Sequence, residues 1–331
     1  MEKGIRYSDF LKQVENRILD FMPEKFKDCK VRIEEINIDD GNIEIMGLFK
    51  EGATAVAGIS LRNYFKEFLA CWDMDRVLKE IAEDYRKLDI EMRVELETGH
   101  GITEKEMELF DFEKVKNKIC FRLMNYNVNR DFLEISLHER CMDFAKVYYI
   151  VEAEDEKGIS YRCIPNVMLD EWGVTLNEVD KAASENTPKY FVPALHEGEE
   201  LSAVILGGPA APNYLHTENL PETRSFYVLT NEKIVLGAAS LMYPDVLQQV
   251  WDMLGKDYYV VPVCTEEVLI MTKESVGNNE KIIHDRLMTG NAILPGDKLL
   301  SNMVLEYTNE DLMLQPIKLY EKASKKKDYE R

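Results

Sequence analysis

The stretch from Phe226 to Lys273 constrains the fold of this chain more than any other part of its sequence. Its apolar, β-branched and aromatic runs alternate with short polar turns, which predicts strands. One segment instead repeats apolar residues at helical spacing and ends at Gly255, which suits the left-handed residue that closes a helix. The stretch is therefore predicted to fold as a β-β-α-β-β unit. The expected strands cover 226–230, 234–242, 258–263 and 268–272, and the expected helix covers 246–254.

Such a unit predicts an α+β fold. Strands with one apolar face need a cover, and a single helix packed on that face provides it. The links between strands are too short for the long crossovers that parallel pairs need. We therefore expect largely antiparallel sheets with helices packed on one face, in two or three lobes.

The rest of the chain is predicted to alternate helices and strands. Helices are expected over 8–23, 61–72, 74–88, 111–123, 175–184 and 280–288. Strands are expected over 31–38, 43–49, 53–60, 133–137, 146–151, 159–164, 201–206, 303–307 and 312–317.

The length of 331 residues exceeds that of most single domains. Glycines flank His100, which makes this point a predicted boundary. We divide the chain into an N-terminal α+β lobe (1–98), a middle helix and hairpin region (99–192) and a C-terminal region (193–331) centred on the β-β-α-β-β unit.

The charge of the chain limits its partners. A net charge of −20 argues against nucleic acid and anionic lipid, because both attract basic surfaces. The longest uncharged run, 201–217, contains Gly207, Gly208 and Pro209 and is not a membrane helix. No membrane association is expected.

Cysteine usage points to a reducing compartment. The six cysteines are scattered, without any Cys-x-x-Cys pair, and several lie in apolar runs. The first 25 residues contain no apolar signal segment. We therefore expect free thiols and a cytoplasmic location.

The common motifs of nucleotide-binding and hydrolytic enzymes are absent. The sequence contains no phosphate loop, no G-x-G-x-x-G, no G-x-S-x-G and no H-E-x-x-H. Its five histidines show no metal-ligand spacing. We expect neither a metal site nor a cofactor.

Four residues are candidates for catalysis. His138 and Asp143 could form an oriented general base if both faced one cleft. Glu266 and Glu267 could raise one another's pKa or bind a cation. The alternatives are that His138 and Asp143 satisfy or cap loops, and that the glutamates lie in a solvated turn. We favour these structural alternatives.

Several short motifs carry a resemblance to a known family. In chain order they are Trp172-Gly173-Val174, Asn186-Thr187-Pro188, FYVLTN from Phe226, GAA from Gly237, Tyr243-Pro244 and Tyr259-Val260-Val261-Pro262. Over about residues 1–320 the chain resembles an uncharacterised domain-of-unknown-function family of soluble bacterial proteins, common in anaerobic Gram-positive bacteria. The resemblance implies an α+β fold and a cytoplasmic bacterial setting, and it brings no established activity.

The chain departs from this family's pattern at two candidate positions. Members often carry proline before the histidine that corresponds to His138, and here Leu137 stands there. Members also carry a Ser-Ser-x-His-Glu run where this chain has Cys264-Thr265-Glu266-Glu267. Glu266 therefore replaces the family's histidine, and no catalytic role of that histidine carries over.

Three functional hypotheses remain. The leading one is a non-enzymatic cytoplasmic binding or protein-interaction module with an unknown protein partner, which predicts an exposed apolar patch. The second is a hydrolase-like enzyme, which predicts that at least three of His138, Asp143, Glu266 and Glu267 surround one pocket. The third is an acidic decoy of a nucleic-acid-binding partner, which predicts a duplex-like stripe of carboxylates.

Overall fold

The chain divides into two compact units. The computed structural model describes residues 5–38, 41–51, 56–155, 158–205, 208–217, 220–221, 226–277 and 279–317. Residues 1–114 and 167–175 form the first unit, and residues 115–166 and 176–331 form the second. Among the described residues, no helix is both long and apolar enough to cross a membrane.

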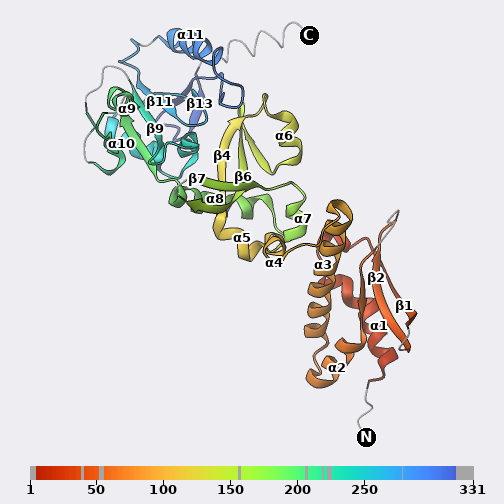
Figure 1. Cartoon of the computed structure of the whole chain (residues 1–331). Helices are drawn as coiled ribbons and strands as arrows, with labels where there is room; N and C mark the ends of the chain where they lie inside the picture. The colour runs from red at the N-terminus through yellow and green to blue at the C-terminus, as the bar shows by residue number, and fades with distance from the viewer. Residues whose placement is uncertain are drawn as a thin grey trace. The chain divides into compact units, whose positions relative to one another are not determined.

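The first unit contains a three-stranded antiparallel sheet and the helices around it (Figure 1). Up to residue 118 the elements are α1 (Tyr7–Arg17), η1 (Ile18–Phe21), η2 (Glu24–Phe26), β1 (Lys30–Ile38), β2 (Gly41–Phe49), β3 (Gly58–Ser60), α2 (Arg62–Cys71), α3 (Met74–Thr98), α4 (Glu104–Met107), η3 (Glu108–Phe110), α5 (Phe112–Val115) and η4 (Lys116–Lys118). Of these, η4 belongs to the second unit. The sheet order is β1-β2-β3, so the predicted hairpin is confirmed. Its turn residues 39–40, and residues 53–55 of the predicted third strand, lie outside the described residues.

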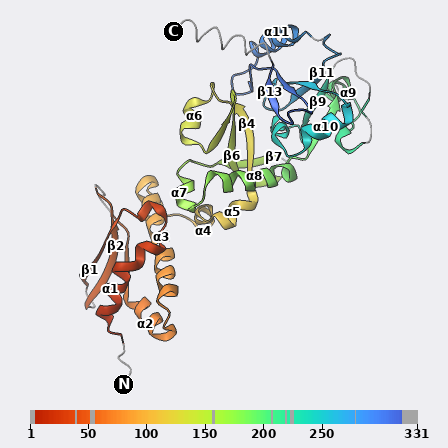
Figure 2. The same ribbon diagram turned by 180° about the vertical axis from the view of Figure 1, so that it is seen from behind.

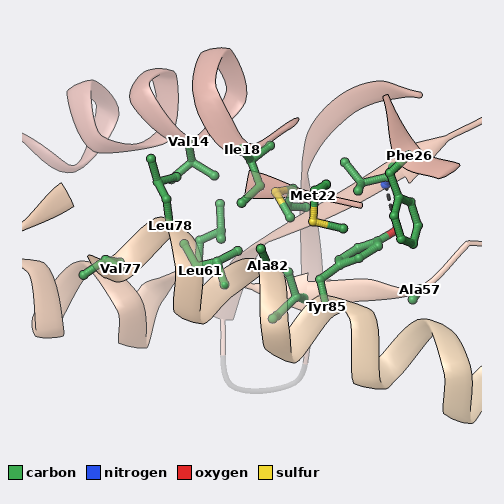
Figure 3. Packing of buried hydrophobic residues seen from close by; sticks show 14 of the residues in the cluster. Val14, Ile18, Met22, Phe26, Ala57, Leu61, Val77, Leu78, Ala82 and Tyr85 are labelled. Carbon is green, nitrogen blue, oxygen red and sulfur yellow. Dashed lines mark hydrogen bonds between the residues drawn. The ribbon is translucent and has the colours of Figure 1, made fainter. Parts of the chain in front are cut away.

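One face of this sheet carries the core of the first unit. Met46 and Leu48 alternate along β2 toward that face, and Ile59 lies opposite Met46 on β3. Helices α1 and α3 cover the face: Figure 3 shows Val14 of α1 facing Leu78 of α3 across the core. The amphipathic stripes that predicted these helices therefore became their buried sides.

Helix α3 also anchors the sheet through a buried hydrogen bond. The Tyr85 hydroxyl accepts from the backbone N–H of Leu48 at 2.9 Å, drawn as a dashed line in Figure 3. The Asp73 side chain caps the start of α3 by accepting from Arg76 N, and Gly99 closes its end with φ 73°. The start of this helix was predicted correctly, whereas its predicted end at 88 falls ten residues short of Thr98.

The second unit contains two further antiparallel sheets. From residue 119 the elements are β4 (Ile119–Asn125), α6 (Arg130–Ile135), β5 (His138–Cys141), β6 (Phe144–Asp155), β7 (Gly158–Cys163), α7 (Met168–Trp172), α8 (Leu176–Tyr190), β8 (Pro193–Glu197), α9 (Gly198–Ile205), η5 (Tyr214–His216), β9 (Tyr227–Asn231), η6 (Gly237–Met242), α10 (Val246–Leu254), β10 (Tyr258–Val261), β11 (Val268–Thr272), α11 (Glu280–Asn291), β12 (Leu305–Tyr307) and β13 (Leu314–Pro316). Of these, α7 belongs to the first unit. The predicted α+β fold with antiparallel sheets is confirmed.

The larger sheet has the order β13-β12-β10-β11-β9-β8. The predicted helix α10 lies against one of its faces, where the Tyr258 hydroxyl donates to the Leu247 carbonyl at 2.8 Å. Helix α11 packs on the opposite face, where Ile283 contacts the cluster around Tyr259. Figure 1 and Figure 2 place α11 beside β11 from opposite directions. The smaller sheet has the order β4-β6-β5, and β7 also pairs with β6.

The predicted second strand of the central stretch, 234–242, is wrong. Residues Ile234 and Leu236 have left-handed backbone angles, with φ 53° and 54°, and 237–242 form the 3₁₀ helix η6. The reason is competition for pairing: β8 and β11 occupy both edges of β9, so no edge is left for a local hairpin. Gly237 packs so closely on Thr230 that an added Cβ would lie 2.0 Å from its Oγ1.

Other local predictions also fail for identifiable reasons. The expected helix 111–123 becomes the short α5 and the strand β4, because the run from Ile119 is buried on both faces rather than on one stripe. Residues 201–205 of the expected strand 201–206 belong to helix α9, and residue 206 lies outside the described residues. The first amides of α9 donate to the Glu197 carboxylate at 2.8 and 3.0 Å. The expected strand 133–137 is mostly helix α6. Helix α8 continues past 184 and includes Pro188 in its last turn.

The division at residue 98 coincides with the end of α3, and the three-part division as a whole stays a prediction. The two compact units differ from it in one respect. Residues 167–175, which we placed in the middle region, pack with the N-terminal unit.

We predict that Tyr85→Phe destabilises the first unit by about 1–3 kcal/mol, because the Leu48 amide is left buried without an acceptor. Hydrogen exchange of the Leu48 amide and of α3 measures the change. Tyr64→Phe is the matched control, because it removes a hydroxyl from Asp84, which keeps Lys87 as a partner. Equal protection in both variants would contradict the prediction.

Candidate functional site

A cavity in the second unit lies between the larger sheet and α11. In the β10–β11 pair, Val261 lies opposite Leu269 and Tyr259 lies opposite Met271. Cross-strand partners project to the same face, so these four side chains form one apolar surface. Three of the four, Val261, Leu269 and Met271, line the cavity and form its floor.

Helix α11 forms the other wall. The Asn279 side chain caps its start by accepting from Ile282 N at 3.3 Å. Ile283 and Leu287 are four residues apart and point toward the sheet, and both are buried. The helix therefore presents an apolar stripe to the apolar surface of the sheet.

The two apolar surfaces enclose a volume of about 510 Å³. Small-molecule sites in proteins commonly occupy about 300–1,000 Å³. Most of the lining is aliphatic, and Phe226 is its aromatic member. The lining residues are Phe226, Val261, Val263, Leu269, Met271, Ser275, Val276, Ile282, Ile283, Arg286, Leu287, Gly290, Asn291, Ile293 and Leu294.

Two polar groups of this lining have unused bonding capacity. Arg286 is exposed, and it forms no hydrogen bond or ion pair with any residue that the structure describes. The Asn291 amide Nδ2 donates to the Ser301 carbonyl at 2.7 Å, and its Oδ1 is buried without a donor among the described residues. The wall can therefore offer a cation and an acceptor to a ligand.

A second, smaller cavity of about 260 Å³ lies in the first unit. Lys25 contacts Asp89 at 3.1 Å and Glu171 at 2.9 Å, and Arg93 contacts the same two carboxylates at 3.1 and 2.8 Å. Two cations thus balance two anions. Glu171 is the member of this cluster that comes from 167–175, so the ion pairs join that segment to the rest of the first unit.

The candidates His138 and Asp143 have separate structural partners. The His138 Nδ1 lies 2.9 Å from the Ser136 carbonyl oxygen. Both carboxylate oxygens of Asp143 are occupied, one by the Ser301 hydroxyl at 2.7 Å and one by the Asn302 amide at 2.9 Å. Asp143 therefore anchors the segment between α11 and β12.

The candidates Glu266 and Glu267 lie in the loop between β10 and β11. Burial acts to raise the pKa of Glu266, but hydrogen bonds from Lys298 and Thr265 outweigh it and lower the pKa. Burial, followed by the charge of Glu266, raises the pKa of Glu267. The two adjacent carboxylates thus carry opposite pKa shifts, because Glu266 has a cationic partner and Glu267 has none among the residues that the structure describes.

The four candidates do not form one network in the described part of the chain. No hydrogen bond or ion pair there joins His138 to Asp143 or to either glutamate. Nor do the described His, Cys, Asp and Glu side chains include three that are placed to hold a metal ion. None of the four lines the cavity.

A family model described as a family of unknown function (DUF5688) matches residues 7–308. The chain belongs to this family. The resemblance to a domain-of-unknown-function family is thereby confirmed. No curated protein and no solved structure matches the chain.

Sequence reasoning missed one buried polar cluster of this DUF5688 chain. The Lys146 Nζ pairs with Asp180 and lies 3.1 Å from the Ser184 hydroxyl, and the Tyr148 hydroxyl donates to Asp180 at 2.7 Å. The cluster therefore docks α8 on β6. The sequence signal was a pair of polar side chains two residues apart on the strand, Lys146 and Tyr148. They face a pair four residues apart on the helix, Asp180 and Ser184.

We predict opposite effects for two neighbouring substitutions in this DUF5688 chain. Glu267→Gln should stabilise the fold at pH 7, because the raised pKa means that ionisation of Glu267 opposes folding. The benefit should disappear as the pH falls below about 4, where Glu267 is protonated in both states. Urea denaturation at several pH values measures the difference.

Glu266→Gln is the matched control and should destabilise at pH 7. Because the pKa of Glu266 is lowered in the folded state, its ionised carboxylate stabilises the fold at pH values above the ordinary pKa of glutamate. This contribution is lost as the pH falls through the lowered pKa. Effects of the same sign in both variants would contradict the assigned charge environments.

Proposed function

We propose that the chain is a non-enzymatic binding protein whose cavity between α11 and the larger sheet holds the apolar part of a small ligand. The observation that carries this proposal is a cavity of about 510 Å³ with a mainly aliphatic lining. A few polar groups at an otherwise apolar wall are typical of sites that bind a ligand and fix its orientation.

Further support comes from the residues that a catalytic mechanism would need. The candidates His138 and Asp143 are engaged by separate partners. None of these residues lines the cavity. A binding role needs no such constellation, whereas the hydrolase-like hypothesis does. The hydrolase-like and acidic-decoy hypotheses stay predictions.

A second candidate function is the binding of a protein partner at the same place. Ile282 and Ile293 both line the cavity and are 44% and 86% exposed, so apolar surface continues outside it. Such surface is typical of interaction sites. We favour the small ligand because a flat protein–protein contact needs no cavity, whereas this site encloses about 510 Å³.

A cytoplasmic setting belongs to this proposal. All six cysteines are free thiols, as a reducing compartment would keep them. The bacterial setting implied by the resemblance stays a prediction.

We predict that wild-type protein binds the neutral apolar dye phenylnaphthylamine with increased fluorescence, and that Gly290→Leu weakens this binding at least about tenfold. Gly290 lines the cavity, and an added Cβ there meets no atom within 4 Å, so the leucine side chain can fill the space. Fluorescence titration measures the affinity, and circular dichroism checks the fold.

Thr289→Leu provides the matched control. It adds the same side chain to the neighbouring position of α11, where Thr289 is exposed and does not line the cavity. Unchanged dye binding is expected. Absence of dye binding to wild-type protein, or equal binding by Gly290→Leu, would overturn the proposal.

A further inference from the structure

We infer that the ligand is a monocarboxylic acid with an unbranched apolar chain, and that its carboxylate pairs with Arg286. This inference rests on the proposed function and specifies the chemistry of the ligand. Three features of the cavity carry it: the composition of its lining, the unpaired cation on its wall and the position of that cation along α11.

The lining limits the charge of the ligand. Among the residues that the structure describes, Arg286 is the charged member of the cavity lining, and no described aspartate or glutamate belongs to it. A polyanion such as a nucleotide would need further cations, and an aromatic base would need more ring surface than Phe226 offers. A single negative charge on an aliphatic body matches the lining.

Arg286 differs from two other cations near this sheet. Lys273 pairs with Glu306, and Lys298 pairs with Glu266. Arg286 has no such partner among the residues that the structure describes, although the chain carries a net charge of −20. A planar guanidinium binds a carboxylate through two parallel hydrogen bonds, which makes a carboxylate the natural complement.

The position of Arg286 fits an amphipathic ligand. One turn before it lies Ile282, beside it lies the buried Leu287, and one turn after it lies Gly290, where space is open. Arg286 is itself exposed. A carboxylate can therefore stay in contact with water at Arg286 while its apolar chain extends toward Leu287 and the sheet.

Competition with the bound dye tests the inference. Octanoic, decanoic and dodecanoic acids are titrated against the alcohols of the same chain length. We expect each acid to displace the dye at least about tenfold more strongly than its alcohol. Affinity should rise about fourfold per added methylene until the cavity is full.

Arg286→Gln should abolish the preference for the acid while leaving the affinity of the alcohol unchanged. Lys281→Gln is the matched control, because it removes the same charge from an exposed position of α11 that does not line the cavity. It should keep the preference. If the preference for the acid came only from the overall positive charge of α11, both variants would lose it equally.

The outcomes separate this inference from the proposed function. Two results would overturn the carboxylate assignment alone. In one, acid and alcohol displace the dye from wild-type protein equally well. In the other, the Arg286→Gln variant keeps the preference for the acid. Wild-type protein that binds the dye but none of the acids also overturns only this inference. Protein that binds neither dye nor acid overturns both.

Discussion

The carboxylate of Asp143 holds the segment on which the architecture of the second unit depends. It accepts from the Ser301 hydroxyl and the Asn302 amide, and Ser301 in turn accepts from Asn291 at the end of α11. Asp143 is 8% exposed and Ser301 is 0% exposed, so each lost bond would leave a buried polar group unsatisfied. The end of α11, and with it one wall of the cavity, is thereby fixed to the loop between β5 and β6.

The sequence predicted most segments whose periodicity reflects one buried face. Helices α1, α3, α10 and α11 appear where apolar stripes recur, and β6, β10 and β11 appear where apolar runs meet turns. The failure at 234–242 has a different origin. That run has strand-like composition, yet β8 and β11 pair with both edges of β9. The local sequence does not indicate which distant strands will pair with β9.

The candidate site was predictable only in part. Apolar positions such as Val261 and Leu287 follow from the pattern, but a hollow arises only when loops hold a helix at a distance from a sheet. That distance depends on contacts such as Asn291 with Ser301, which no spacing in the sequence reveals. The sequence candidates instead drew attention to Asp143 and Glu266, whose partners lie far along the chain in the segment 298–302.

The return of residues 167–175 to the first unit imposes an order on biosynthesis. Lys25 and Arg93 receive the counter-charge of Glu171 only after β4 to β7 have been translated. A nascent chain that ends at residue 114 holds both cations with Asp89 but lacks this buried glutamate. The N-terminal unit therefore cannot reach its final electrostatic balance during translation until residues 167–175 have been synthesised. Because these residues follow 115–166 in the chain, a single cut after residue 114 cannot release the unit intact.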